Sequence, residues 1–290
     1  MISVIITAFK EPKTIGRAIS AIAKQKIADE IIVSAPDNET LSVAKRLSSK
    51  YKNIVLVRDK GVGKPAALNL AVSKAKGDIL ILTDGDVYVS KYSLKHLLKK
   101  MEESNIGAVS GNPVSLNPKT NKYGFWAYML TGVADEIRKE SVSKDKRFFC
   151  SGYLFAIRRK LFPKLPENLL SEDGYISHKV YQKGFKIKYS EDAKVFVKYP
   201  DNFSDWIKQK KRSAGGYNQM KIIIGTQMRS FSSESRGTFR FFKFVKSIKQ
   251  LWWLLELLFA RLYLWYVIYR DINLRKKSHK ELWLRVESTK

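Results

Sequence analysis

Two carboxylates, Asp84 and Asp86, follow a run of branched apolar residues and could together bind a cation. The run Ile79–Leu82 predicts a strand buried on both faces, and open α/β sheets bind their ligands at the carboxyl ends of such strands. Gly85 between them permits a tight turn, so both side chains can face one point. Converging carboxylates repel each other unless a cation lies between them. A divalent ion that also binds substrate phosphates meets this need, and the alternative is a polar turn without a ligand.

Two further segments carry side chains that could do chemistry. Lys64 ends a basic, glycine-rich loop, 60–65, that opens a helix, where it could meet a phosphate together with backbone N–H groups. The loop lacks the spacing of a P-loop, and a solvated lysine is the alternative. Glu172 and Asp173 open a later helix, with Ser171 as the predicted N-cap. The helix dipole favours carboxylates there in any case, so a structural role and an acid–base role both remain open.

The first half of the chain alternates predicted strands with predicted helices. This alternation favours right-handed crossovers and a mostly parallel central sheet flanked by helices, which is an α/β fold. The predicted strands are 2–8, 30–33, 54–57 and 78–83, and the predicted helices begin near Pro12, Glu39 and Pro65.

The pattern beyond Asp86 is mixed. Helices are predicted over 93–101, 123–138, 171–183 and 202–224, with the last broken at 214–216, and strands over 108–116 and 185–189. The segment 148–159 is predicted to be a loop and a strand that run into a basic turn. The N-terminal region, 1–225, is therefore expected to form one large domain, followed by a helical region over 226–290.

Charge and cysteine content narrow the functional class. The 290-residue chain has 54 basic and 27 acidic residues, a net charge of +27, which implies an anionic partner: nucleic acid, a nucleotide substrate or an acidic membrane. The single cysteine, Cys150, excludes a disulfide within the chain, fits a reducing compartment and is predicted to lie in the core. We expect no secretory signal peptide, and no nucleic-acid-binding motif is present.

Taken together, the motifs resemble the inverting family 2 glycosyltransferases, which have a GT-A (Rossmann-like) fold. The resemblance spans about residues 1–219, and its specificity comes from the number, order and spacing of motifs that are weak individually. They are the segment 7–11, Lys64 with 67–69, the strand from Gly77 to Asp86, Gly152 with 158–159, the segment 171–173, the segment 184–187, and Gln209 with Arg212.

The resemblance implies a role for each matched residue. Asp86 would hold Mg²⁺ or Mn²⁺ on the diphosphate of a UDP- or GDP-linked sugar, and Asp173 would be the general base for the acceptor hydroxyl. Gly152 and Glu172 would lie on the acceptor side. The donor nucleotide would contact Thr7, Ala8, Phe9, Glu11, Asp37, Lys64, Asp84, Gln209 and Arg212.

The chain departs from the family pattern at two places. The family usually has adjacent aspartates after the second strand, whereas here Ser34-Ala35-Pro36 precede Asp37, which leaves the identity of the nucleotide base open. The tryptophan that usually follows the Gln-x-x-Arg motif is replaced by Ser213. The aromatic platform of polymer-extending relatives is therefore absent, which favours a single-addition enzyme over a processive synthase.

The C-terminal region combines a predicted linker, 230–237, with a long predicted helix, 239–269. The first half of this helix is amphipathic, and the second half is apolar except for Glu256 and Arg261. Its aromatic residues suit the headgroup region of a membrane. They are Trp252, Trp253, Phe259, Tyr263, Trp265 and Tyr266.

Basic residues flank both ends of the apolar segment, which suits a helix lying on one leaflet better than one crossing the bilayer. They are Lys243, Lys246 and Lys249 before it, and Arg270, Arg275, Lys276, Lys277 and Lys280 after it. The apolar segment just reaches across a bilayer, but its two charges are costly there. The alternatives are a packed helix of the core or of an oligomer, and a single membrane span.

These observations together predict a metal-dependent inverting hexosyltransferase with a lipid-linked or membrane-borne acceptor. We expect it at the cytoplasmic face of the cell membrane, bound to an anionic surface as a peripheral or single-pass protein. A soluble glycosyltransferase or another nucleotide-sugar enzyme is the alternative. A basic nucleic-acid-binding protein would explain the charge but not the two carboxylate pairs.

Overall fold

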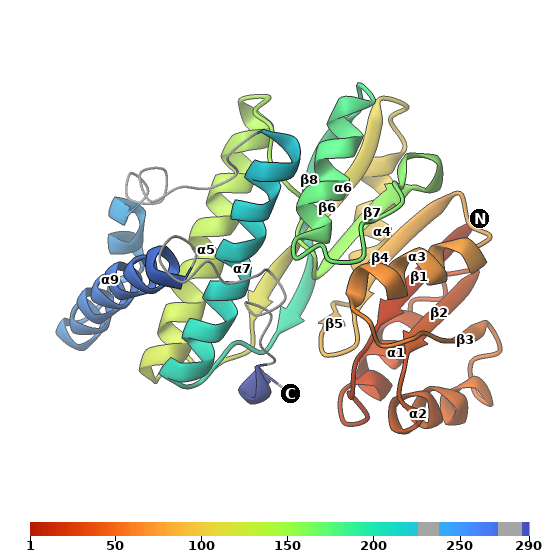
Figure 1. The fold of residues 1–290 in the computed structure, drawn as a ribbon, viewed down its shortest axis with the longest axis horizontal. Helices are drawn as coiled ribbons and strands as arrows, with labels where there is room; N and C mark the ends of the chain where they lie inside the picture. Colours follow the sequence, from red (N-terminus) through yellow and green to blue (C-terminus); the bar gives the residue numbers. More distant parts are fainter. Residues whose placement is uncertain (226–237, 272–285, 290) are drawn as a thin grey trace.

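The computed structural model describes residues 1–225, 238–271 and 286–289. Its centre is an eight-stranded sheet in the order β3-β2-β1-β4-β7-β6-β8-β5, with helices on both faces (Figure 1). Strands β1 (Ile2–Thr7), β2 (Glu30–Ala35), β3 (Ile54–Arg58) and β4 (Ile79–Asp84) are parallel to one another. The predicted α/β fold with a central sheet flanked by helices is confirmed.

Helices α1 (Ile15–Ala23), α2 (Asn38–Ser48) and α3 (Lys64–Lys74) connect these four strands. Two apolar cores lie on opposite faces of the sheet, one under α1, α2 and α4 (Ser93–Met101) and one under α3 and α6 (Glu172–Gln182). Successive residues of one strand serve different cores, because side chains alternate along a strand. Val4 belongs to the first core and Ile5 to the second, so the central strands read as continuous apolar runs.

The sheet becomes mixed beyond β4. After β4 the chain forms, in order, β5 (Tyr88–Val89), α4 (Ser93–Met101), β6 (Ile106–Ser115), α5 (Lys122–Ser143), β7 (Leu154–Arg158), the 3-10 turn η1 (Arg159–Leu161), α6 (Glu172–Gln182) and β8 (Lys186–Val197). Strand β7 is antiparallel to both β4 and β6. The strand predicted over 185–189 is much longer, because β8 pairs with β6 along its length and then with β5.

Helix α7 (Phe203–Ile224) is continuous, so the predicted break at 214–216 is wrong. A Cβ atom on Gly216 would lie 3.1 Å from the Cβ atom of Ser171. Glycine in a helix interior costs up to about 1 kcal/mol relative to alanine, and here it permits close packing against the segment before α6. Gly225, with a φ of 69°, ends the helix.

The predicted helix over 239–269 consists instead of two elements, the 3-10 segment η2 (Thr238–Phe244) and the α-helix α9 (Ile248–Tyr269). They separate because Ser247 caps α9, with its hydroxyl accepting a hydrogen bond from the backbone N–H of Gln250 at 3.3 Å. A short 3-10 turn, η4, covers Glu287–Thr289. The predicted linker 230–237 and the basic residues 275–280 lie outside the described residues.

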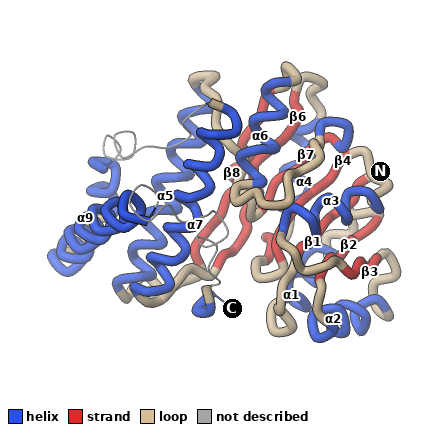
Figure 2. The backbone as a smooth tube through the Cα atoms, viewed as in Figure 1, coloured by secondary structure: helices blue, strands red, loops and turns tan. Residues whose placement is uncertain are grey.

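A third apolar core joins α9 and η2 to α5 and α7. Figures 1 and 2 show α5 and α7 side by side, with α9 beside them at the end of the molecule away from β3. The indole N–H of Trp126 in α5 donates to the carbonyl oxygen of Trp253 in α9 at 2.7 Å. The buried carboxylate of Asp271, just beyond α9, forms ion pairs with Lys211 of α7 and with Arg270. The described part of the C-terminal region is therefore packed on the N-terminal region.

The Lys211–Asp271 pair gives a test of this packing. We expect Lys211→Met to lower the free energy of unfolding by about 3 kcal/mol, because it removes one cation from a carboxylate with no exposed surface. Urea denaturation followed by circular dichroism measures this. Lys144→Met is the control, because Lys144 is 56% exposed and pairs with Glu140 on the surface, where a pair contributes under about 1 kcal/mol. Equal losses in the two variants would show that the buried pair does not hold α9 in place.

Candidate active site

The carboxyl ends of the adjacent strands β1 and β4 form the floor of the candidate site. Thr7 and Asp84 are register partners, and the Thr7 hydroxyl donates to Asp84 Oδ1 at 3.4 Å. Gly85 follows directly, and its N–H donates to the Thr7 carbonyl at 2.9 Å. A Cβ atom on Gly85 would lie 2.5 Å from Glu11 Oε2 and 2.7 Å from the Cβ atom of Ala8. The glycine is not in the left-handed region, so it is required for this close approach rather than for an unusual turn.

Lys64 links two carboxylates that come from distant parts of the chain. Its ammonium lies 2.7 Å from Asp84 Oδ1 and 2.7 Å from Glu172 Oε1, so it joins the end of β4 to the start of α6. The loop before it contains Gly61 and Gly63 with φ values of 66° and 132°, which only glycine adopts readily. Burial alone would lower the pKa of Lys64, but the two carboxylates raise it above its ordinary value. The ammonium therefore stays charged.

The carboxylates around Lys64 outnumber the charge that it supplies. Burial raises the pKa of Asp84, Lys64 opposes this only in part, and the charge of Asp86 raises it further. Burial also acts to raise the pKa of Glu172, but the Lys64 charge and hydrogen bond hold it below its ordinary value. Asp84, Asp86 and Glu172 thus create a negative field that one lysine does not neutralise, which favours binding of a further cation.

The residues present fit a divalent ion of the Mg²⁺ or Mn²⁺ type. Such ions prefer oxygen ligands and are commonly bound by one or two carboxylates together with substrate phosphates. Asp84 and Asp86 supply oxygen ligands of this kind. Among the described residues no three His, Cys, Asp or Glu side chains form a complete metal cluster, so the remaining ligands would come from the substrate and from water.

Asp173 lies beside this group, held by three hydrogen bonds. Its Oδ2 accepts from the N–H of Gly152 at 3.0 Å, and its Oδ1 accepts from the N–H of Gly174 at 2.8 Å and the hydroxyl of Ser171 at 2.9 Å. Ser171 occupies the predicted N-cap position, but its hydroxyl donates to Asp173 and makes no capping bond. Burial raises the pKa of Asp173, and the charge of Glu172 raises it further. A carboxylate with a raised pKa is a stronger general base.

Tyr153 is a site residue that the sequence reasoning missed. Its carbonyl accepts from the hydroxyl of Thr83 at 2.8 Å, which places it beside the end of β4, and its ring lies 6.2 Å from that of Tyr199 in an edge-on arrangement. Burial raises its pKa, and the charge of Arg212 opposes this shift. Asp84, Asp86 and Lys64 also affect its pKa. The sequence could have indicated Tyr153, because it is an aromatic residue between Gly152, which matches the family pattern, and the strand β7.

Helix α7 brings Arg212 to the same centre. The Arg212 charge helps to lower the pKa of Glu172 as well as that of Tyr153. Gln209, one turn earlier, is buried and lines a small hollow with Tyr199 and Trp206. The structure thus brings Arg212 to the carboxylates, while Gln209 lies toward Tyr199.

The segment after β1 is fixed by Asp37. This carboxylate caps α2 by accepting from the N–H of Thr40 at 2.9 Å, and it also accepts from the N–H of Lys10 at 2.8 Å. Burial acts to raise the pKa of Asp37, but these hydrogen bonds lower it overall. Phe9, 38% exposed, and buried Glu11 lie on either side of Lys10. Asp37 therefore shapes the segment 8–11, and its contact with a nucleotide stays a prediction.

Asp59 is a second residue that the sequence reasoning did not select. It lies buried just after β3, where it accepts from the hydroxyl of Ser34 at 3.0 Å and from the N–H of Gly61 at 2.8 Å. It thereby anchors the glycine-rich loop before Lys64. Its position in the sequence could have indicated it, because Asp59 is a carboxylate just after a parallel strand, as Asp86 is after β4.

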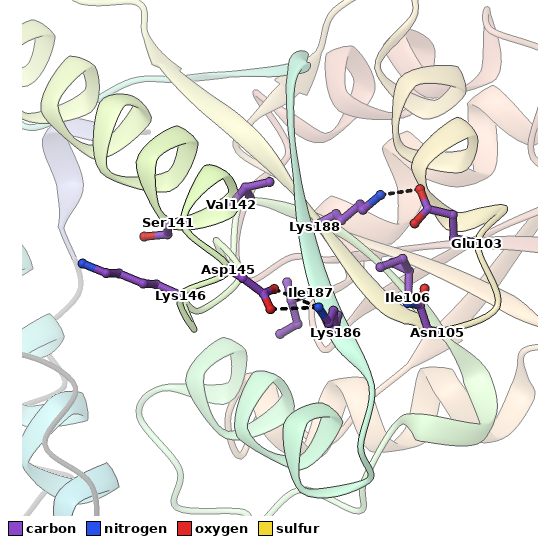
Figure 3. Close-up of a pocket in the computed structure, with 10 residues that line it drawn as sticks. All are labelled: Glu103, Asn105, Ile106, Ser141, Val142, Asp145, Lys146, Lys186, Ile187 and Lys188. Atoms are coloured by element: carbon purple, nitrogen blue, oxygen red, sulfur yellow. Dashed lines mark hydrogen bonds and ion pairs between the residues drawn. The ribbon is translucent and has the colours of Figure 1, made fainter.

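A separate cavity of about 260 Å³ lies at the opposite end of the sheet, around the starts of β6 and β8 (Figure 3). Its charged residues pair with one another, Lys186 with Asp145 at 2.9 Å and Lys188 with Glu103. The matched arginine Arg158 also lies at this end, where it donates to backbone carbonyls, including that of Ile106 at 2.8 Å. These features belong to the scaffold rather than to the candidate active site.

The sequence profile of glycosyl transferase family 2 matches residues 3–165, which is more than half of the chain. The chain belongs to this family.

A probable glycosyltransferase of Bacillus subtilis (strain 168), YdaM, is 26% identical over 236 residues, covering 77% of this chain and 56% of the relative. The O-antigen chain rhamnosyltransferase WbaN of Salmonella anatum is 26% identical over 179 residues, covering 57% and 54%. The chain thus spans about half the length of these two relatives. RfbN of Salmonella typhimurium, also named an O-antigen chain rhamnosyltransferase, is 27% identical over 250 residues, covering 74% and 77%.

The fold is similar to that of solved glycosyltransferases. A mannosyltransferase of Pyrobaculum calidifontis, PcManGT, solved with GDP-Man and Mn²⁺, has a TM-score of 0.64 at 16% identity, covering 96% of this chain and 88% of that protein. S. aureus TarS has a TM-score of 0.51 at 17% identity, covering 84% and 42%. The GT-A-type fold expected from the sequence is confirmed.

The proximity of Glu172 and Asp173 gives a test of the site's electrostatics. We expect Glu172→Gln to lower the pKa of Asp173, because it removes a negative charge that disfavours ionisation and leaves Lys64 less neutralised. Carboxyl ¹³C chemical shifts, recorded as the pH is lowered, follow the Asp173 titration directly. Glu167→Gln, at an exposed position before α6, is the matched control and should leave the titration unchanged. An unchanged or higher Asp173 pKa in Glu172→Gln would disprove the coupling.

Proposed function

We propose that this protein is a metal-dependent inverting glycosyltransferase that moves a hexose from a UDP- or GDP-linked sugar to a hydroxyl group of a lipid-linked or membrane-borne acceptor. The observation that carries the proposal is the bridge made by Lys64. It holds Asp84, the last residue of the central strand β4, and Glu172, at the start of the helix that bears Asp173, around one centre. A displacement at an anomeric carbon needs both a charge-neutralising donor site and a base facing the acceptor.

The donor side is formed by Asp84, Asp86, Lys64 and Arg212. Mg²⁺ or Mn²⁺, held by Asp86, would supply positive charge to the leaving diphosphate. Arg212, which lies near Glu172 and Tyr153, would bind the diphosphate from α7. PcManGT, which shares the fold, was solved with a nucleotide sugar and Mn²⁺, and this agrees with the proposed donor and metal. Thr7, Ala8, Phe9 and Glu11 would line the nucleotide, with Asp37 and Gln209 at its edges.

The acceptor side is formed by Asp173 with Gly152 and Glu172. Asp173 is held in one orientation by backbone N–H groups, and its raised pKa suits removal of a hydroxyl proton as the new glycosidic bond forms. Single displacement, and therefore inversion of configuration, needs one base and no second nucleophilic carboxylate. Glu172, which pairs with Lys64, would help to keep the pKa of Asp173 raised through its negative charge.

The membrane-borne acceptor is proposed from two findings. Two relatives are named O-antigen chain rhamnosyltransferases, and α9 is long and apolar enough, by length and composition, to cross a bilayer, with a mean hydropathy of 1.5. We place the protein at the cytoplasmic face of the membrane, because its one cysteine, Cys150, is a buried free thiol that suits a reducing compartment. A soluble glycosyltransferase acting on a free saccharide is the second candidate, because one face of α9 is packed on the protein.

Asp86 is the test of metal binding. We expect Asp86→Ala to abolish Mn²⁺- or Mg²⁺-dependent stabilisation by GDP and UDP, while the fold is retained because a repulsive carboxylate is removed. Thermal shift measurements with each nucleotide, with and without the ion, show the effect. Asp192→Ala, at an exposed position in β8, should behave as the wild type. Unchanged ion-dependent stabilisation in Asp86→Ala would show that Asp86 is not a ligand.

Asp173 is the test of the base. We expect Asp173→Asn to retain nucleotide stabilisation and to lose transfer of radiolabelled hexose to lipid-linked saccharides by about 10²–10⁴-fold. The matched control is Glu167→Gln. A parallel loss of donor binding would assign Asp173 to the donor site or to the scaffold, and full activity would show that the acceptor group needs no deprotonation, as for a phosphate.

A further inference from the structure

Helix α9 has two apolar faces, and within the described ranges 1–225, 238–271 and 286–289 only one of them is covered by protein. The inner face packs on α5 and α7 through six buried residues, Leu254, Leu257, Ala260, Leu264, Val267 and Ile268. The outer face carries nine exposed apolar or aromatic residues, Ile248, Leu251, Trp252, Leu255, Phe259, Leu262, Tyr263, Tyr266 and Tyr269. At about 100° per residue, these nine fall within a stripe about 120° wide that contains no charged residue.

The side chains of the outer stripe are large, apolar and strongly exposed. Phe259 is 71% exposed, Trp252 64% and Tyr266 59%. The helix has 22 residues and is therefore about 33 Å long, so the stripe is a continuous apolar surface rather than a scatter of single residues. A contiguous exposed patch of this kind marks an interaction site or an aggregation risk.

We propose that this outer stripe of α9 is a docking surface for an anionic bilayer, on which the helix lies in the plane of one leaflet. The inference rests on the proposed function and deepens it, since it names the surface that brings the catalytic domain to a membrane-borne acceptor. Four of the nine stripe residues are tryptophan or tyrosine, whose amphipathic rings favour the headgroup region. Trp253 and Trp265, which the sequence reasoning grouped with them, are half-buried and pack toward the protein instead.

The packing of the inner face argues against a span. A spanning α9 would bring the helices packed on it, α5 and α7, into the hydrocarbon. Those helices carry Lys139, Lys210 and Lys211, and a charged side chain in the bilayer centre is costly. An in-plane helix avoids this cost, because only the outer stripe enters the interface.

Charge argues for a bilayer over a second copy of the chain. Self-association through the stripe would juxtapose two chains that each carry a net charge of +27. Cations lie near both ends of α9 in the described part of the chain, with exposed Lys246 and Lys249 at the start and Arg270 at the end. An anionic leaflet complements both the apolar stripe and these cations.

The docked surface is connected rigidly to the candidate site. Asp271, just beyond α9, pairs with Lys211, the residue before Arg212 in α7. The Trp126–Trp253 hydrogen bond fixes the other half of α9 to α5. Docking of α9 therefore sets the orientation of the whole catalytic domain relative to the membrane plane.

The test uses the full-length chain and two matched double variants. Phe259→Asp/Tyr266→Asp places carboxylates in the stripe, and Tyr92→Asp/Ile137→Asp places the same groups at exposed apolar residues, 53% and 43% exposed, just before α4 and in α5. Co-sedimentation with phosphatidylglycerol-containing vesicles and with pure phosphatidylcholine vesicles measures docking. We expect stronger binding of the wild type to the anionic vesicles, at least a tenfold loss in the stripe variant, and no comparable loss in the control.

The remaining outcomes separate the alternatives. High salt should release the docked protein, because screening weakens the contribution of the cations, whereas a spanning helix would resist it and overturn the in-plane arrangement. A wild type that ignores vesicles would overturn docking, and light scattering would then show whether a dimer, lost in the stripe variant, covers the stripe. Nucleotide-dependent thermal stabilisation is read in parallel. Stabilisation without vesicle binding removes only the docking inference, and vesicle binding without stabilisation removes only the proposed function.

Discussion

The structure depends on one lysine that pairs with two carboxylates from distant elements. Without Lys64, Asp84 at the end of β4 and Glu172 at the start of α6 would be two half-buried negative charges facing each other. Its ammonium is held in turn by the loop that Gly61, Gly63 and Asp59 shape. Three chain segments thus meet because the charges of Asp84 and Glu172 must be partly balanced, and a negative field remains at the site.

Strands β1, β2 and β4 could be predicted because they are buried on both faces and read as apolar runs, as Ile79–Leu82 does. The carboxylates at their ends followed from the parallel topology. The resemblance to family 2 likewise indicated Asp173, and the structure places it beside the Lys64 group. What these arguments could not supply was the ion pairing, because no local pattern shows that Lys64 reaches both Asp84 and Glu172.

Two of the errors share a physical cause, which is tertiary contact overriding local signals. Gly216 suggested a helix break, but α7 continues because the absence of a side chain lets it approach Ser171. The short strand predicted near 185–189 extends because β6 offers a partner along its length. The aromatic residues of α9 were treated as one group, whereas helical periodicity divides them, with Trp253 toward α5 and Phe259 toward solvent.

The contact between α7 and the segment before α6 has a mechanical consequence. Besides the close approach at Gly216, the side-chain amide of Gln219 accepts from the N–H of Leu170 at 2.8 Å and donates to the carbonyl of Asn168 at 2.9 Å. Helix α7, which carries Arg212, is therefore held by hydrogen bonds and close packing against the segment 168–171, directly before Asp173. A displacement of α7 would therefore move Asp173 together with Arg212. In the proposed enzyme, any widening of the donor site would then fall to the opposite wall, the segment after β1, where Asp37 accepts a hydrogen bond from the N–H of Lys10.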